Sequence, residues 1–146
     1  MATIATSAST KNATPSIDWG RYARVGLGTI VAAILANVLV YYLGGALVAY
    51  DPQFPPLANV SGAVIFTVVP AIVAVLLYAI LLRFARRPAR TFAIVAAAVL
   101  ALSIVPDFTS APTLPGATGG QIAILILMHV VAAALITATL TRLARP

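Results

Sequence analysis

The feature that most constrains this chain is a series of long apolar segments that contain almost no charge. No charged residue occurs between Arg24 and Asp51, and a second apolar segment runs from Val60 to Leu82. Each is longer than the ~20 residues that a helix needs to cross the ~30 Å hydrocarbon core of a bilayer. Only 8% of the residues are charged, against about 25% in an average soluble domain. We therefore expect a membrane protein and exclude a soluble enzyme.

Four segments are apolar enough, and long enough, to be membrane-spanning helices. The predicted spans cover about residues 25–48, 60–82, 88–105 and 121–141. The segments are continuously apolar and do not alternate with polar residues, which disfavours a transmembrane β-barrel. The predicted fold class is therefore all-α, a polytopic membrane protein built as a four-transmembrane-helix bundle.

The predicted domain organisation is a tail followed by one membrane domain. Residues 1–20 are mostly rich in Ser, Thr and Ala and are interpreted as a flexible cytoplasmic tail. Residues 21–146 form the four-helix transmembrane domain. Pro88 suits the first turn of the third helix, where its missing N–H costs nothing.

The cations predict how the helices are oriented, because Lys and Arg near a span are retained on the cytoplasmic side. All nine lie before the first span, between the second and third, or after the fourth. With four spans these groups share one face, so both termini are predicted to be cytoplasmic. We expect a multi-pass protein of the bacterial inner membrane. Contact with anionic lipid headgroups is assigned to the cluster Arg83, Arg86, Arg87 and Arg90.

Small and polar residues recur four positions apart along the predicted helices, and such stripes let transmembrane helices approach closely. In the fourth span the stripe contains His129, Ala133 and Thr137. The opposite side of that span is expected to face lipid, and it consists of Ile124, Leu127, Val131 and Leu135.

A candidate polar site follows from the depth of four residues, His129, Asn37, Asp107 and Ser103. At ~1.5 Å of rise per residue, Asn37, Pro70 and His129 are expected in one layer near the bilayer midplane or slightly outside it. Asp107 is expected at the outer mouth, about a turn above Ser103. An Asp107–His129 contact then requires the loop after the third span to dip inward. Polar groups inside a membrane usually face the bundle interior, so these residues are the candidates for binding.

Pro70 lies in the middle of the second span and is a candidate hinge. A proline inside a helix frees the carbonyl four residues earlier, here that of Phe66, and kinks the helix. We favour the kink over a gating role.

Each candidate also has a structural interpretation, which we favour. His129 is interpreted as a hydrogen-bonded packing residue, with a proton carrier or ligand contact as the alternative. Asn37 is interpreted as a contact between helices and Asp107 as a cap or solvated helix end. The chain has one His, no Cys and no Glu, whereas a metal site normally needs three or four ligands. No metal and no cofactor are predicted.

Two short motifs resemble a known family. They are Met128-His129-Val130-Val131-Ala132-Ala133 in the fourth span, and Pro106-Asp107 before a Pro/Gly-rich loop. The chain resembles an uncharacterised family of small four-helix membrane proteins from GC-rich bacteria, over about residues 20–143. The resemblance implies the fold, and places His129 and Met128 at motif positions. It implies no activity.

Three function classes remain open. The first is a non-catalytic accessory or structural subunit that packs against other membrane helices, in a larger complex or a homo-oligomer. This class is favoured because no nucleophile–base pair, nucleotide motif or intramembrane Glu or Lys is present. The second is a small oligomeric transporter or channel that uses the polar layer around His129. The third is a membrane enzyme acting on lipid or quinone through Asp107 and His129. We expect no nucleic acid partner and no enzyme activity.

Overall fold

The computed structural model describes residues 17–144 as four long helices joined by short connections. They are α1 (Trp19–Leu47), α2 (Val60–Phe84), α3 (Pro88–Thr109) and α4 (Gly119–Leu143), with a short 3-10 helix η1 (Ala111–Thr113) after α3. All four are long and apolar enough to cross a membrane. The predicted all-α, four-helix membrane fold is confirmed. Most of the predicted tail, with Lys11, and Arg145 lie outside the described residues.

Local sequence signals explain where the helices begin. The side chains of Asp18, Asn59 and Thr118 cap α1, α2 and α4 by accepting hydrogen bonds from backbone N–H groups in the first turn. Such caps satisfy N–H groups that have no partner inside the helix. α3 has no side-chain cap, but Pro88 occupies its first position and brings no N–H that would need a partner.

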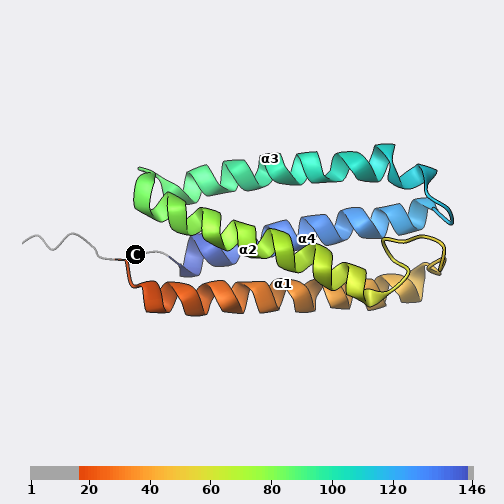
Figure 1. Ribbon diagram of the computed structural model, residues 1–146, viewed down its shortest axis with the longest axis horizontal. Coiled ribbons are helices and arrows are strands. Elements are labelled where there is room, and N and C mark those ends of the chain that lie inside the picture. The colour runs from red at the N-terminus through yellow and green to blue at the C-terminus, as the bar shows by residue number, and fades with distance from the viewer. Residues whose placement is uncertain (1–16, 145–146) are drawn as a thin grey trace, which may run out of the picture.

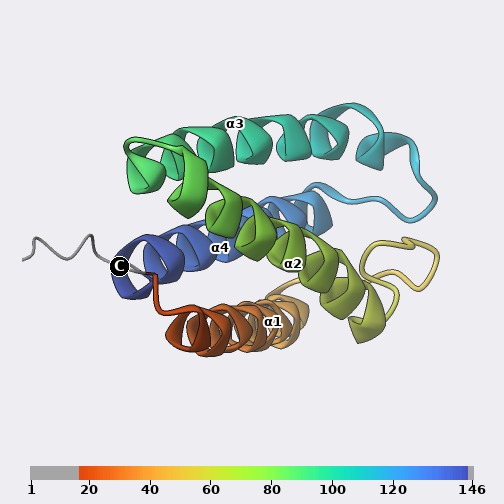
Figure 2. The same ribbon diagram turned by 60° about the vertical axis from the view of Figure 1, so that its left-hand side comes forward.

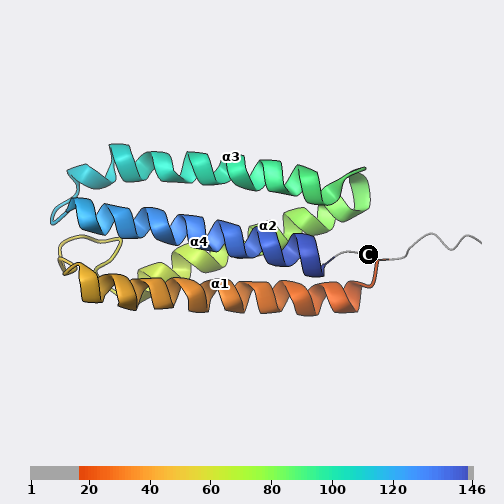
Figure 3. The same ribbon diagram turned by 180° about the vertical axis from the view of Figure 1, so that it is seen from behind.

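The helices are arranged as a layer of three crossed by a fourth. α1, α4 and α3 lie side by side in that order, with α4 in the centre (Figures 1 and 3). α2 crosses this layer diagonally, from beside α3 at one end to beside α1 at the other (Figures 1 and 2). α2 and α3 therefore diverge along the length of the bundle, although they are joined by a tight turn.

The two ends of the bundle differ in charge. The antiparallel arrangement brings the start of α1, the α2–α3 turn and the end of α4 together (Figure 1), and we call this the basic end. There the Arg21 Nη2 donates a hydrogen bond to the Leu143 carbonyl oxygen at 3.2 Å. The opposite end, formed by residues 48–59 and 110–118, is called the loop end. The described arginines all belong to the basic end, and they are Arg21, Arg24, Arg83, Arg86, Arg87, Arg90 and Arg142.

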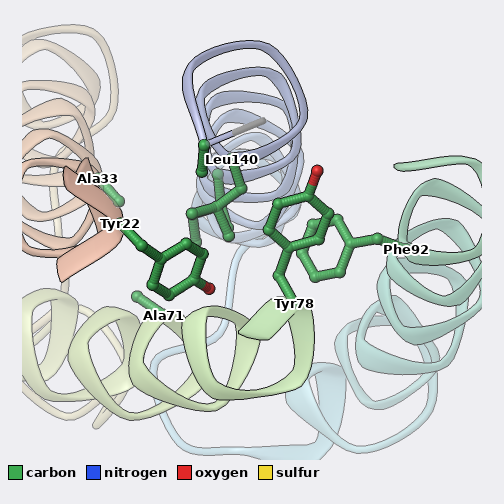
Figure 4. Packing of buried hydrophobic residues seen from close by; sticks show 8 residues of the cluster. Tyr22, Ala33, Ala71, Tyr78, Phe92 and Leu140 are labelled. Atoms are coloured by element: carbon green, nitrogen blue, oxygen red, sulfur yellow. The ribbon is translucent and has the colours of Figure 1, made fainter. Parts of the chain in front are cut away.

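An aromatic core closes the basic end. Tyr78 of α2 packs between Tyr22 of α1 and Phe92 of α3, with ring centroids 6.4 Å and 5.0 Å away. Leu140 of α4 is buried in the same cluster, as Figure 4 shows. Each of the four helices contributes to this cluster, so it ties all four together near the basic end.

A buried amide ties the two connections of the loop end together. Gln121 is fully buried, and its Nε2 donates to the Gly116 carbonyl at 2.8 Å. Its Oε1 accepts from the Asp51 backbone N–H at 3.2 Å. Gly116 has a φ of 70°, which suits glycine, and an added Cβ there would come within 2.6 Å of Asp51 Cγ. This contact holds the loop end against the start of α4.

Two expectations about the helices are wrong. The third helix does not end at residue 105; it continues through Pro106 to Thr109. Pro106 has no N–H to donate to the preceding turn, so the helix lacks one hydrogen bond there without ending. The face of α4 assigned to lipid is also partly covered. Ile124 is buried and Leu135 packs on the core cluster, because α4 is the central helix and α1 covers that side.

Candidate functional site

A lateral cleft of about 590 Å³ lies where α2 and α3 diverge, with α4 as its back wall. Its lining extends along α4 from Leu125 to Thr137, which is ~18 Å of helix rise. Leu77 and Phe92 close it toward the basic end, and Leu114 lines it at the loop end. Small residues leave this space open, and they include Ala74, Ala96, Ala132 and Ala133.

The mouth of the cleft opens sideways. Phe66 and Val73 of α2 and Val99 of α3 line the cleft, yet each is more than half exposed. Side chains that are exposed in this way on membrane-spanning helices face the lipid tails. The cleft is thus reached from within the bilayer, between two of the spans.

Asn37 enters the cleft from α1 and is paired with α2. Its Nδ2 donates a hydrogen bond to Thr67 Oγ1 at 2.8 Å, and the Thr67 hydroxyl donates to the Ala63 carbonyl at 2.6 Å. Both residues are buried. Asn37 therefore contacts another helix, as expected, but only through its amide nitrogen. Its Oδ1 accepts no hydrogen bond from the described residues.

Asp107 and His129 meet across the interface of α3 and α4. The His129 Nδ1 lies 2.9 Å from the Leu125 carbonyl oxygen, one turn earlier in α4, and 3.4 Å from Asp107 Oδ2. Since the carbonyl can only accept, Nδ1 carries a proton that it donates to Leu125. This proton is directed away from Asp107, whose Oδ2 has no hydrogen-bond partner among residues 17–144.

Contrary to expectation, the Asp107–His129 contact does not depend on the loop after α3 dipping inward. Asp107 does not lie at an outer mouth; it is buried in the last turns of α3, and residues 110–118 follow it. The helix carries Asp107 to His129 because it continues past Pro106. The depth of His129 was estimated from the rise along α4 alone, and this estimate did not indicate how deep the end of α3 lies.

The cleft gathers all five of the polar and hinge candidates. Besides Asn37, Asp107 and His129, it is lined by Ser103 and Pro70. The Ser103 hydroxyl donates to the Leu100 carbonyl of its own helix at 2.8 Å. Pro70 faces the same space as Pro106, so each helix that borders the mouth contains a proline.

The remaining candidates lie elsewhere. The cluster Arg83, Arg86, Arg87 and Arg90 is exposed at the α2–α3 turn and does not line the cleft. Within residues 17–144, no group of three His, Cys, Asp or Glu side chains is placed to hold a metal ion.

Sequence reasoning missed two residues of the site. Thr67 was not among the candidates, although it is the partner of Asn37. Pro106 was placed after the third helix, although it lines the cleft from inside α3. The signal for Thr67 was a second polar residue at similar depth on a neighbouring span. For Pro106 the signal was the apolar character of Phe108, which follows Asp107 and prolongs the segment.

Fold and site define a class: a four-helix multi-pass membrane protein with a lateral cleft between two of its spans. The chain belongs to a family of unknown function, DUF6069, whose model matches residues 17–146. This confirms the resemblance to an uncharacterised family of four-helix membrane proteins. Comparison with curated proteins and with solved structures gave no significant match.

Proposed function

We propose that this protein is a non-catalytic multi-pass membrane protein that holds the apolar chain of an amphiphilic molecule in its cleft. The observation that supports this most is the cleft itself, about 590 Å³ in volume and entered between α2 and α3. Binding sites for small molecules have volumes of roughly 300–1,000 Å³ and are mostly apolar with a few polar groups. A molecule dissolved in the bilayer reaches such a site without crossing water.

The shape of the cleft favours a flexible chain over a transmembrane helix of a partner protein. A helix that spans the ~30 Å hydrocarbon core needs ~20 residues, whereas the cleft follows only ~18 Å of α4. Leu77 and Phe92 also close it before the basic end. A partner helix, from a larger complex or from a second copy, is therefore proposed to pack on the outer helix faces and not in the cleft. The accessory role that we propose is to hold an amphiphile for such a partner.

The polar residues support binding more than catalysis. The Asp107–His129 pair resembles a general base held by a carboxylate. Such a pair would need a nucleophile beside it, but the hydroxyl of Ser103 on α3 donates its hydrogen bond to a carbonyl of its own helix and not to His129. The observation that favours a transporter, as a second candidate, is a proline on each side of the mouth, Pro70 and Pro106. Proline in both walls allows the opening to widen without unfolding either helix.

Filling the cleft tests the proposed function. Ala132→Phe introduces a ring into the back wall, so we expect the variant to lose most of the amphiphile that the unmodified protein retains after extraction. Native mass spectrometry of protein released from nanodiscs measures this occupancy. The matched control is Ala123→Phe, on an exposed position of α4 outside the cleft lining, which should retain it. Equal occupancy in both variants, or no bound amphiphile in the unmodified protein, would contradict the proposal.

We further propose that the protein resides in the inner membrane of a bacterium with the basic end in the cytoplasm. The positive-inside rule supports this orientation, since the described arginines share that end. Arg83, Arg86, Arg87 and Arg90 then contact anionic headgroups of the cytoplasmic leaflet.

Cysteine labelling checks the orientation, because the chain has no cysteine. In intact cells, Gln53→Cys at the loop end is expected to react with a membrane-impermeant maleimide. Gly20→Cys at the basic end is expected to react only after the membrane is opened. Both positions are exposed, so the reverse pattern would show the opposite orientation.

A further inference from the structure

Two residues that line the cleft, Asn37 and Asp107, each carry a buried oxygen that accepts no hydrogen bond from the described residues, although Asp107 Oδ2 lies 3.4 Å from His129 Nδ1. Asn37 is 4% exposed and Asp107 is 6% exposed. Asn37 Oδ1 and Asp107 Oδ2 are the buried side-chain atoms without a hydrogen-bond partner in residues 17–144. Burying a polar atom without a partner costs about 1–3 kcal/mol, and more for a charged group. A pair of such atoms in one cleft is therefore an observation that points to a ligand.

His129 adds a third acceptor when its ring is neutral. Its Nδ1 proton is donated to the Leu125 carbonyl, which leaves Nε2 with a lone pair. The His129 side chain is 37% exposed and lines the cleft. In that state the polar part of the cleft has three acceptors: Asn37 Oδ1 on α1, Asp107 Oδ2 on α3 and His129 Nε2 on α4. The Nδ1–H of His129 is not available as a donor, because it is bonded to Leu125.

The cleft lining carries an acidic residue and no Lys or Arg. Asp107 is its only Asp, Glu, Lys or Arg among the lining residues. The described arginines belong to the basic end, and none of them lines the cleft. An anionic headgroup in the cleft would meet a carboxylate without an arginine to offset it, and like charges repel strongly where water is excluded.

Building on the proposed function, we propose that the cleft selects amphiphiles whose head carries hydrogen-bond donors and no negative charge, namely an ammonium or a hydroxyl group. The head binds at Asp107 and His129, and the chain lies along α4 toward Leu77 and Phe92. An ammonium head donates to Asp107 Oδ2 and compensates its charge. A hydroxyl head donates to the same oxygen without charge compensation, so it binds less tightly.

Three probes of equal chain length test this selectivity: hexadecylamine, hexadecanol and hexadecanoate. Each is titrated against the full chain in nanodiscs made of uncharged lipid, and occupancy is read by native mass spectrometry. The amine is expected to bind about tenfold more tightly than the carboxylate, because the ammonium gains a charge-assisted hydrogen bond to Asp107, whereas the carboxylate has no proton to donate and is repelled. The alcohol should fall between them. These arms also distinguish an ammonium source from a hydroxyl source.

Asp107→Asn is the variant that isolates the head site, since it keeps the shape of the side chain. We expect the preference for the amine over the carboxylate to fall at least about threefold, with binding of the alcohol nearly unchanged. Asp51→Asn is the matched control, because Asp51 is a loop-end carboxylate outside the cleft lining. It should leave the order of the three probes unchanged.

Each outcome separates the two proposals. If no probe binds the unmodified protein, the proposed function is wrong. If all three bind equally, or if Asp51→Asn alone removes the preference, the cleft binds chains but the head selectivity is wrong. A second measurement needs no variant: a photoreactive hexadecylamine should label residues 103–110 of the unmodified chain. Labelling confined to the basic end would overturn the assignment of the head to Asp107.

Discussion

Tyr78→Ala is expected to lower the free energy of unfolding by about 3–5 kcal/mol, the range found for truncating a buried aromatic side chain. Tyr78 is 1% exposed and contacts rings on two other helices, Tyr22 on α1 and Phe92 on α3. Its removal leaves a cavity between the side chains of this cluster, which Figure 4 shows. The loss is measured by denaturant titration of the purified protein in micelles.

The control for this change is Phe84→Ala, on the same helix. Phe84 is 76% exposed, so its removal creates no cavity and should change the unfolding free energy by less than about 1 kcal/mol. The two variants test whether the aromatic core carries the stability of the basic end. A loss for Phe84→Ala as large as that for Tyr78→Ala would show that the exposed ring is covered by a partner.

Two glycines of α1 are expected to respond differently to alanine. At Gly44, an added Cβ would come within 2.5 Å of the Tyr50 hydroxyl and within 3.0 Å of two atoms of Ile124 on α4. Burial raises the pKa of Tyr50, so its hydroxyl stays protonated and donates to the Tyr41 carbonyl at 2.8 Å. The ring cannot move away without losing this bond. Gly44→Ala should therefore destabilise the protein by about 1–3 kcal/mol.

Gly28→Ala is the matched change in open surroundings. No atom lies within 4 Å of an added Cβ at Gly28, and alanine is better in a helix interior than glycine by about 0.8–1.0 kcal/mol. This variant should be equally stable or more stable. Melting temperatures of the two variants in the same detergent give the comparison. A stable Gly44→Ala protein would mean that α1 and α4 are not held as closely at the loop end as the contacts of Gly44 require.

The helices were predictable because each carries its own signal. Length and continuous hydropathy located all four, and Pro88 marked the start of α3 at the position that the structure gives. The end of α3 was not predictable in the same way. Pro106 reads as a stop signal, and the apolar Phe108 beyond Asp107 was the weaker sign that the helix continues to Thr109.

The polar candidates were found because polar residues are rare in such spans, so each one is conspicuous. The Asp107–His129 contact was considered, but the Asn37–Thr67 pair was not, because pairing depends on how the helices are ordered in space. The sequence pattern does not show that α4 is the central helix, and this is why Ile124 was assigned to lipid. The same ordering brings Asn37 to Thr67 and leaves Asp107 Oδ2 without a donor.

The central place of α4 has a consequence for the biosynthesis of the protein. α1 and α3 make no contact with each other in the described part of the chain, and each packs against α4. During synthesis α4 is the last of the four to leave the ribosome, so the earlier three can associate only as neighbours along the chain. The back wall of the cleft therefore arrives last, and a nascent protein stalled before residue 119 lacks the helix against which α1 and α3 pack.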